Sequence, residues 1–239
     1  MTDDANHRPP LGLPPGLHAA LDGFVRHGEL CGALALVVDR DGNAAHGSVG
    51  CADPRTGMRF ALDTLVRVHS MSKPLTTAAF LTLVEAGTVS LDTPLADVLP
   101  EFAVMRVAHE HGSFPSARPI TMEHLLTHTS GLTYANASGS RAERSMAAAT
   151  ADDCSPDGAS SLAEWAARAS RAELASVPGE AWTYGVGIDV IGRVIEVLTG
   201  LPLEVALRER LFEPVGMRDT GFRVAADARH RVAPILRRA

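Results

Sequence analysis

Residues 70–87 read SMSKPLTTAAFLTLVEAG and form the clearest helical segment of this 239-residue chain. Small and apolar residues recur there at the three- and four-residue spacing of one helix face: Leu75, Ala79, Leu83 and Ala86. Pro74 suits the opening turn of a helix, and Gly87 is typical of the position after the last turn. The pattern therefore predicts a helix over residues 70–87.

A Ser-x-x-Lys motif, Ser70 to Lys73, opens this helix. Side chains three positions apart share a helix face, with Cβ atoms roughly 5 to 6 Å apart. Lys73 is the only lysine among 22 Lys and Arg residues, and lysine, unlike arginine, loses its proton when its surroundings lower its pKa. We therefore expect a neutral Lys73 amine to activate the Ser70 hydroxyl as a nucleophile. The competing interpretation is that Ser70 only caps the helix and Lys73 is solvated.

Tyr184 lies in PGEAWTYGVGIDVIG, residues 178–192, where a Gly- and Pro-rich loop meets a helical pattern. A phenol beside an ammonium group can be held as phenolate or can relay a proton. The alternative is a buried aromatic ring with one hydrogen bond. Tyr134 and Trp182 stand near these motifs in the sequence, and we expect both to line a substrate site.

The remaining segments divide into an N-terminal part with strands and a longer helical part. Residues 33–50 are two strands joined at Asp41-Gly42, a strong hairpin signal. Residues 137–161 are small and polar, which predicts a mobile surface insertion. Helical periodicity is found in five further segments: residues 17–28, 121–128, 162–169, 187–200 and 202–216.

These elements predict an α/β part beside a helical domain. Residues 1–65 supply a helix and a hairpin to the α/β part, residues 66–225 form the helical domain, and residues 226–239 begin a return to the sheet. A lone hairpin is marginally stable in water. We therefore expect the chain to be part of a longer polypeptide, or to have a partner chain, that completes the sheet. The oligomeric state is left open.

Composition excludes several classes of protein. The 22 basic and 28 acidic residues give a net charge of −6, which argues against non-specific binding to nucleic acid. No stretch approaches the roughly 18 apolar residues of a membrane span. The acidic, Pro-rich start lacks the pattern of a signal peptide. A cytoplasmic protein without nucleic-acid or membrane partners is therefore expected.

Other constellations indicate neither a metal nor an organic cofactor. The three cysteines lack a CxxC pair, so we expect them to be reduced. His124 and His128 have metal-ligand spacing but no evident third ligand. The nucleophile elbow GxSxG and the dinucleotide motif GxGxxG are both missing. His69 points away from its neighbour Ser70 on a helix and is expected to be packing or surface.

Four motifs in order give the chain a resemblance to the serine β-lactamase-like superfamily, over about residues 15–235. They are TLVRVHSMSKPLTTAAFLTLVEAGTVSLDTPLADVLPEF, ITMEHLLTHTSGL, PGEAWTYGVGIDVIG and LRERLFEPVGMRDTGF. The chain looks closest to class C β-lactamase relatives that include family VIII carboxylesterases, D-aminopeptidases and acyltransferases. The resemblance implies Ser70 as the acyl-forming nucleophile, Lys73 as its activating partner and Tyr184 as a proton shuttle.

Two departures from the family pattern shape the predicted function. The middle motif is commonly Tyr-x-Asn, whereas Tyr184-Gly185-Val186 puts an apolar side chain where an amide would bind substrate. With Val186 in the substrate site, an ester or acyl chain fits better than a β-lactam or peptide. The resemblance also implies a third motif after the helical domain, a Lys-Thr-Gly-like or His/Trp-x-Gly strand that lines the pocket, and we expect it to follow residue 239.

The prediction is therefore an ester hydrolase or acyltransferase for a small-molecule substrate. The alternatives are a β-lactamase or D-amino-acid peptidase or amidase of the same fold, and an inactive or incomplete binding protein.

Overall fold

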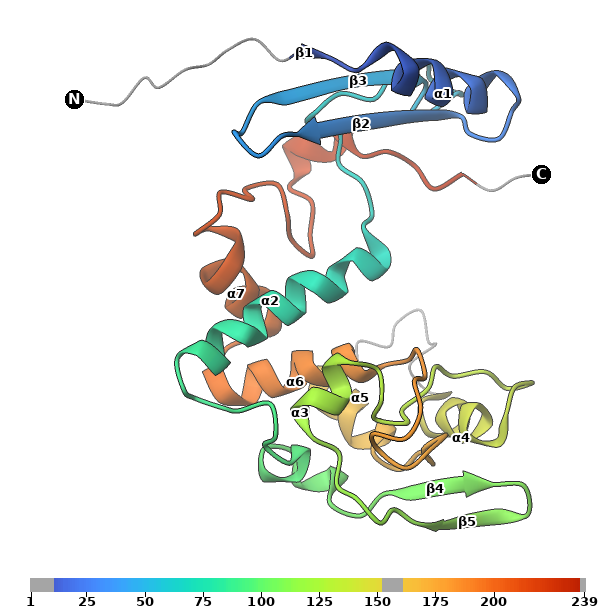
Figure 1. Ribbon diagram of the computed structural model, residues 1–239, viewed down its shortest axis with the longest axis vertical. Coiled ribbons are helices and arrows are strands. Elements are labelled where there is room, and N and C mark those ends of the chain that lie inside the picture. Colours follow the sequence, from blue (N-terminus) through green and yellow to red (C-terminus); the bar gives the residue numbers. More distant parts are fainter. Residues whose placement is uncertain (1–10, 152–160, 237–239) are drawn as a thin grey trace. The chain divides into compact units, whose positions relative to one another are not determined.

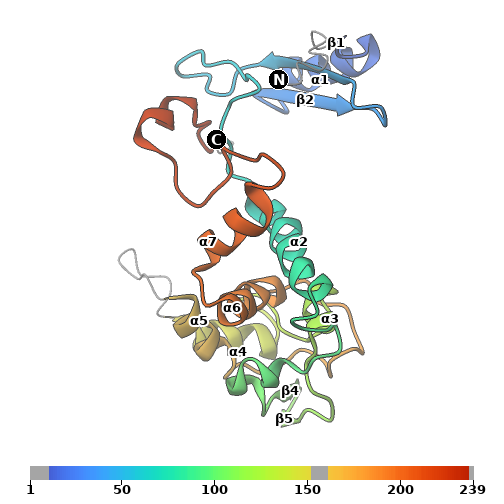
Figure 2. The same ribbon diagram turned by 90° about the vertical axis from the view of Figure 1, so that its left-hand side faces the viewer.

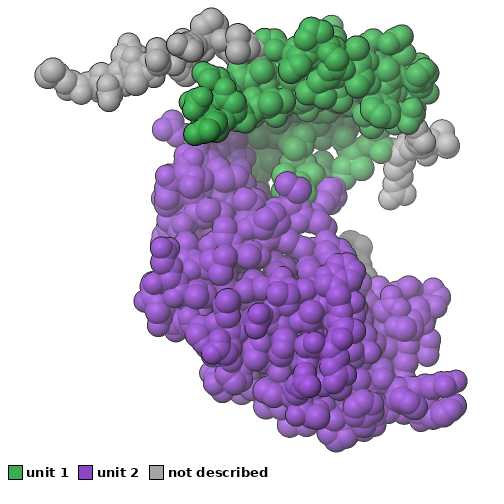
Figure 3. All heavy atoms as spheres, viewed as in Figure 1, with its two compact units in different colours: residues 1–68, 223–239 green, residues 69–222 purple. Residues whose placement is uncertain are grey.

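The computed structural model describes residues 11–151 and 161–236, and the chain divides into two compact units (Figure 3). Unit 1 comprises residues 1–68 and 223–239, and unit 2 comprises residues 69–222. The boundaries expected from the sequence were 65/66 and 225/226. The chain thus leaves unit 1 just before the Ser-x-x-Lys motif and returns to it near its end.

Unit 1 is built on the expected hairpin, which the structure confirms. Strands β2 (Gly32–Val38) and β3 (Ala44–Gly50) pair antiparallel. A carboxylate oxygen of Asp39 accepts hydrogen bonds from the backbone N–H groups of Asp41 and Asn43, both at 2.9 Å. Gly42 has φ 82°, a left-handed conformation that glycine adopts without steric cost. The turn residues therefore fix the register of the two strands.

A short third strand and a helix complete the N-terminal part of unit 1. Strand β1 (Leu11–Gly12) pairs parallel with β3, an element that the Pro-rich leader did not predict. Helix α1 (Pro15–Arg26) packs against β3 (Figure 1). The sheet order is β1-β3-β2, so β2 is an edge strand.

The C-terminal segment joins unit 1 through a parallel bridge. A short 3₁₀ helix over Ala226–Arg231 precedes it. The Leu65 N–H donates to the Arg231 carbonyl and the Ala233 N–H donates to the Leu65 carbonyl, both at 2.9 Å. These bonds bring together segments that lie more than 160 residues apart in the sequence.

Unit 2 is organised around helix α6 (Gly187–Thr199), whose buried side chains are mostly β-branched and aliphatic. Helix α2 (Ser72–Glu85) packs against it (Figures 1 and 2). The predicted helix is confirmed, but its buried face is rotated from the predicted stripe because Phe80, the bulkiest apolar residue, turns inward and leaves Ala86 exposed. The buried residues of α2 are Thr76, Ala79, Phe80 and Leu83.

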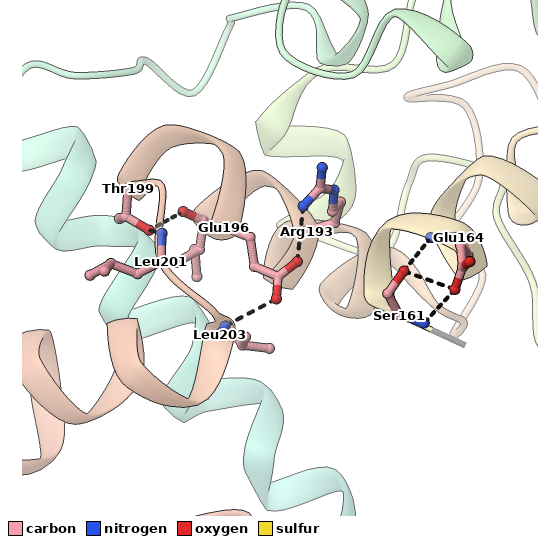
Figure 4. Close-up of polar contacts among 8 residues, drawn as sticks. Ser161, Glu164, Arg193, Glu196, Thr199, Leu201 and Leu203 are labelled. Atoms are coloured by element: carbon pink, nitrogen blue, oxygen red, sulfur yellow. Dashed lines mark hydrogen bonds and ion pairs between the residues drawn. The ribbon is translucent and has the colours of Figure 1, made fainter. Parts of the chain in front are cut away.

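Shorter helices surround this pair. They are α3 (Met122–Leu126), α4 (Arg141–Ala149), α5 (Leu162–Ala169) and α7 (Leu203–Leu207), with 3₁₀ turns at Leu95–Asp97 and Pro100–Phe102 and a π-helical turn at Arg208–Phe212. Figure 4 shows how polar side chains fix the ends of α5 and α6. Glu196 accepts from Arg193 at 3.0 Å and from the Leu203 N–H at 3.1 Å, which ties α6 to α7. Ser161 and Glu164 form a capping box at the start of α5.

Two features of unit 2 differ from the sequence predictions. Strands β4 (Arg106–His109) and β5 (Gly112–Pro115) form a hairpin where only helix and loop were expected; Val107 anchors it in the core. Within the expected mobile insertion, α4 is capped by Ser140 and Glu143 and buries Met146. A cap and two buried apolar side chains, Ala142 and Met146, suffice there, although the segment is rich in small residues. Residues 152–160 of that insertion lie outside the described residues.

None of the helices within residues 11–151 and 161–236 has the length and apolar character needed to span a membrane.

Candidate active site

Ser70 lies in a strained turn directly before α2. A 3₁₀ turn over His69–Met71 precedes the first residue of the helix. His69 has φ 45°, in the left-handed region, a conformation that costs a non-glycine residue of the order of 1 to 3 kcal/mol. Ser70 is exposed and Lys73 is half-buried on the first turn of α2. The turn therefore presents the hydroxyl at the positive end of the helix dipole.

The loop that carries Tyr184 approaches unit 2's other segments closely because two glycines permit it. A Cβ atom on Gly185 would collide with the carbonyl oxygen of Leu132. A Cβ atom on Gly187 would lie 2.7 Å from the carbonyl oxygen of Leu125 in α3. The absence of side chains at both positions thus lets Tyr184 lie beside Tyr134.

Aromatic rings surround Tyr184. The Tyr134 ring meets it edge-on with centroids 5.5 Å apart, and the Trp182 ring stacks on it at 6.2 Å with 22° between planes. The His128 ring lies 4.8 Å away at 52°. Such offset and edge-to-face pairs stabilise a fixed ring orientation. The cluster therefore holds the phenol in place although 40% of Tyr184 is exposed.

Lys73 connects the two tyrosines to the Ser70 turn. Its Nζ donates a hydrogen bond to the Tyr134 oxygen at 2.9 Å and lies 5.0 Å from the centroid of the Tyr184 ring. Partial burial is the largest single influence and lowers the pKa of Lys73, but hydrogen bonding and electrostatic attraction from both tyrosines outweigh it. The pKa of Lys73 therefore lies above its usual value. This direction favours the ammonium form of Lys73, in contrast to the neutral amine that the sequence led us to expect.

Tyr184 shows the opposite change. Hydrogen bonding with Ser70 is the largest cause that lowers the pKa of Tyr184, followed by hydrogen bonding with Lys73. Desolvation raises it by less, and the charge of Lys73 lowers it further. The pKa of the phenol therefore lies below its usual range. Loss of the Tyr184 proton is therefore favoured beside the Ser70 hydroxyl.

An acidic residue also acts on the Lys73 environment. Asp189 lies in the first turn of α6 and keeps accessible surface. Loss of hydration raises the pKa of its carboxyl, and attraction to Lys73 opposes that rise.

One region of unit 2 contains Ser70, Lys73, Tyr134, Trp182 and Tyr184. The contacts of some predicted site residues differ from those expected. Tyr134 was expected to contact substrate, and it also binds Lys73. Trp182 is 68% exposed and available to a ligand. Val186 was expected in the substrate site, whereas it caps α6, is 7% exposed and packs in the hydrophobic core. A contact between its side chain and substrate stays a prediction.

His124 of α3 and His128, which follows that helix, have separate surroundings. His124 Nδ1 accepts from the Thr121 N–H at 3.2 Å in a capping box. His128 follows the helix and packs on Tyr184. Within the described ranges, no three His, Cys, Asp or Glu side chains are grouped to hold a metal ion. The sequence did not indicate His128 as a site residue, because neither its positive φ nor its contact with the Tyr184 loop leaves a periodic signal.

Comparison with known proteins identifies the family. The Beta-lactamase family model matches residues 17–239, so this chain belongs to that family. It is 38% identical over 218 residues to Esterase EstB of Burkholderia gladioli. The matched region covers 88% of this chain and 52% of EstB. It is 31% identical over 210 residues to the lovastatin esterase of Penicillium rubens, and the matched region covers 82% of this chain and 49% of that esterase. The chain thus spans about half the length of these curated relatives.

A solved structure supports the same fold. EstCE1, described as a hydrolase with promiscuous acyltransferase activity, superposes with a TM-score of 0.76 at 27% identity, over 91% of this chain and 54% of EstCE1. The matched part therefore has the β-lactamase/transpeptidase-like fold that the resemblance implied.

Proposed function

We propose that this protein is a serine hydrolase that cleaves carboxylic esters of small molecules, or transfers their acyl groups, through an acyl-enzyme on Ser70. The observation that carries the proposal is the position of Lys73 Nζ, which lies 2.9 Å from the Tyr134 oxygen and 5.0 Å from the centroid of the Tyr184 ring, on the helix that follows the exposed Ser70. The pKa of Tyr184 is lowered and that of Lys73 is raised, which favours a phenolate and ammonium pair there. Similarity to two esterases and to a hydrolase with acyltransferase activity supports the same reaction class.

In the first half of the reaction, the Tyr184 phenolate takes the proton of Ser70 while the serine oxygen attacks the ester carbonyl carbon. Backbone N–H groups at the start of α2 stabilise the negative charge that develops on the carbonyl oxygen. The Tyr184 phenol then returns the proton to the leaving alcohol as its bond to carbon breaks. Lys73 stays charged and holds the phenolate throughout.

In the second half, water or an acceptor alcohol gives its proton to Tyr184 and attacks the acyl carbon. The bond to Ser70 breaks, and the serine oxygen recovers a proton from Tyr184. No metal or organic cofactor takes part. The exposed faces of Trp182 and Met71, 68% and 66% exposed, offer apolar contact to an acyl chain beside Ser70.

The test is hydrolysis of p-nitrophenyl butyrate by the protein and two matched variants. Ser70→Ala should abolish turnover, whereas Ser72→Ala should keep it within about threefold because Ser72 is exposed and alanine favours helix. Turnover by Ser70→Ala at the level of the unaltered protein would refute the proposal. Nitrocefin hydrolysis as fast as ester hydrolysis would instead favour the β-lactamase alternative.

We also propose that further strands complete the sheet of unit 1. β2 is an edge strand, and its last three side chains, Leu36, Val37 and Val38, are 56%, 43% and 58% exposed. An apolar edge of this kind is prone to pair with another strand. In a longer form of the protein, or with a partner chain, hydrogen exchange of the β2 amides should slow. Equal exchange in both forms would exclude pairing at β2.

A further inference from the structure

Backbone strain in the described residues is concentrated at the candidate site. Among the described residues other than glycine, two have positive φ angles, His69 (45°) and His128 (57°). His69 adjoins Ser70, and His128 packs on Tyr184. Glycine or asparagine would adopt this conformation more easily than histidine. Strain of this kind persists where surrounding structure enforces it, which makes the imidazole at position 128 a candidate for a role in the site.

His128 holds the Tyr184 segment at two points. Its ring centroid lies 4.8 Å from that of Tyr184 and 6.3 Å from that of Trp182. Its carbonyl oxygen accepts a hydrogen bond of 2.7 Å from the N–H of Thr183, the residue before Tyr184. The left-handed backbone at position 128 is what allows one residue to present both its carbonyl and its ring to the same segment. Asparagine could keep the hydrogen bond of the carbonyl oxygen and would lose the ring contact.

The ring nitrogens of His128 do not explain its presence. Nδ1 is buried without a hydrogen-bond partner among the described residues. Desolvation is the main cause that lowers the pKa of His128, and the positive charge of Lys73 lowers it further. The imidazole is therefore neutral at neutral pH and adds no second cation beside Lys73. Its contribution is through the contact of its face with the phenol ring.

We propose that His128 is a positioning residue: its ring forms one wall of the aromatic cluster and fixes the Tyr184 oxygen at the Ser70 hydroxyl and the Lys73 ammonium. This inference rests on the proposed role of Tyr184. Groups that face the phenol from the other packed elements are Lys73 of α2 and Tyr134, with Trp182 stacked on it.

The kinetic test compares His128→Asn and His128→Gly with a control in the preceding helix α3, His124→Asn. Both substitutions at position 128 relieve backbone strain, which offsets the lost ring packing, so both variants should fold. The proposal predicts a kcat for p-nitrophenyl butyrate lower by about tenfold or more, with KM within about twofold, because only the geometry of the proton transfer is lost. His124→Asn should lower stability and leave kcat unchanged. An unchanged kcat in both variants of His128 would overturn the proposal.

A second test needs no turnover, so its outcome is independent of the proposed esterase function. The chain has two tyrosines, Tyr134 and Tyr184, and in Tyr134→Phe the tyrosinate absorbance at 295 nm reports Tyr184 alone. Adding His128→Asn should raise the midpoint of that titration, since a phenol that turns away from Ser70 and Lys73 loses the interactions that lower its pKa. An identical midpoint in the single and double variants would overturn the positioning role.

Discussion

The Nζ atom of Lys73 donates a hydrogen bond of 2.9 Å to the phenolic oxygen of Tyr134. This contact is one of the causes that raise the pKa of Lys73. In the proposed mechanism Lys73 therefore keeps its proton, and Tyr184, whose pKa is lowered, is the base. The single lysine of the chain then acts as a compact ammonium group, whereas the sequence favoured a proton acceptor.

Tyr134→Phe should narrow the pH profile of kcat/KM. Activity should rise as Tyr184 loses its proton and fall when Lys73 loses its own. Hydrogen bonding from Tyr134 raises the pKa of Lys73 and lowers that of Tyr184. Without the Tyr134 hydroxyl, the alkaline limb should move to lower pH and the acid limb to higher pH. Profiles with identical limbs would show that Tyr134 acts on neither group.

Substitutions of Lys73 separate its two possible roles. Lys73→Arg keeps the positive charge and Lys73→Ala removes it, while neither can accept a proton at neutral pH. If Lys73 stabilises the Tyr184 phenolate, the arginine variant should keep at least about tenfold more ester hydrolysis than the alanine variant. Equal losses in the two variants would restore the neutral amine as the base.

Gly185→Ala should damage the site through the backbone. A Cβ atom there collides with the carbonyl oxygen of Leu132, so the loop must move away and carry Tyr184 with it. We expect a loss of stability of about 1 to 3 kcal/mol and a lower kcat. Gly112→Ala is the matched control, since a Cβ atom at Gly112 meets nothing within 4 Å and that residue has no positive φ. Denaturant unfolding measures the stability of both variants, and ester hydrolysis measures their kcat. A fully active Gly185→Ala would contradict the packing argument.

The ion pair between Arg141 and Glu173 predicts a pH-dependent contribution to stability. Arg141 of α4 donates to both carboxylate oxygens of Glu173, at 2.7 and 2.9 Å. Hydrogen bonding with Arg141 is the main cause that lowers the pKa of Glu173. A carboxyl with a lowered folded-state pKa stabilises the protein above its unfolded pKa, and this contribution is lost as pH falls through the folded value.

Arg141→Gln should therefore lower the free energy of unfolding at pH 7, by a modest amount because Arg141 is exposed to solvent. The difference from the unaltered protein should shrink as pH falls below the ordinary range of a glutamate. Arg40→Gln removes an almost fully exposed arginine and should change nothing. Urea unfolding at pH 7 and at acidic pH measures both effects, and a constant difference at all pH values would exclude the pair as its source.

Much of the architecture could be predicted because it rests on local signals. The Asp41-Gly42 turn, the Ser-x-x-Lys helix and the periodic apolar residues of α6 each follow from spacing and turn chemistry. The β4–β5 hairpin and helix α4 could not be predicted in this way. Each depends on one or two buried residues, Val107 or Met146, whose partners lie far away in the sequence.

The sequence named residues that the structure brings together at the candidate site, but it did not indicate their electrostatics. Ser70, Lys73 and Tyr184 were named from a rare lysine, a rare tyrosine and a motif. The charge state of Lys73 depends on Tyr134, 61 residues away, through a contact that sequence spacing does not contain. His128 was likewise hidden, because a left-handed residue after a short helix has no pattern of its own.

The most direct measurement of the central claim is the rate at which a fluorophosphonate probe labels Ser70 as pH is varied, in the unaltered protein and in Tyr184→Phe. Peptide mass spectrometry should find the label on Ser70. Its rate should increase with pH through a midpoint below the ordinary pKa of tyrosine, and should fall by about 10² or more in Tyr184→Phe. A label on another residue, or equal rates in the two proteins, would contradict activation of Ser70 by the Tyr184 phenolate.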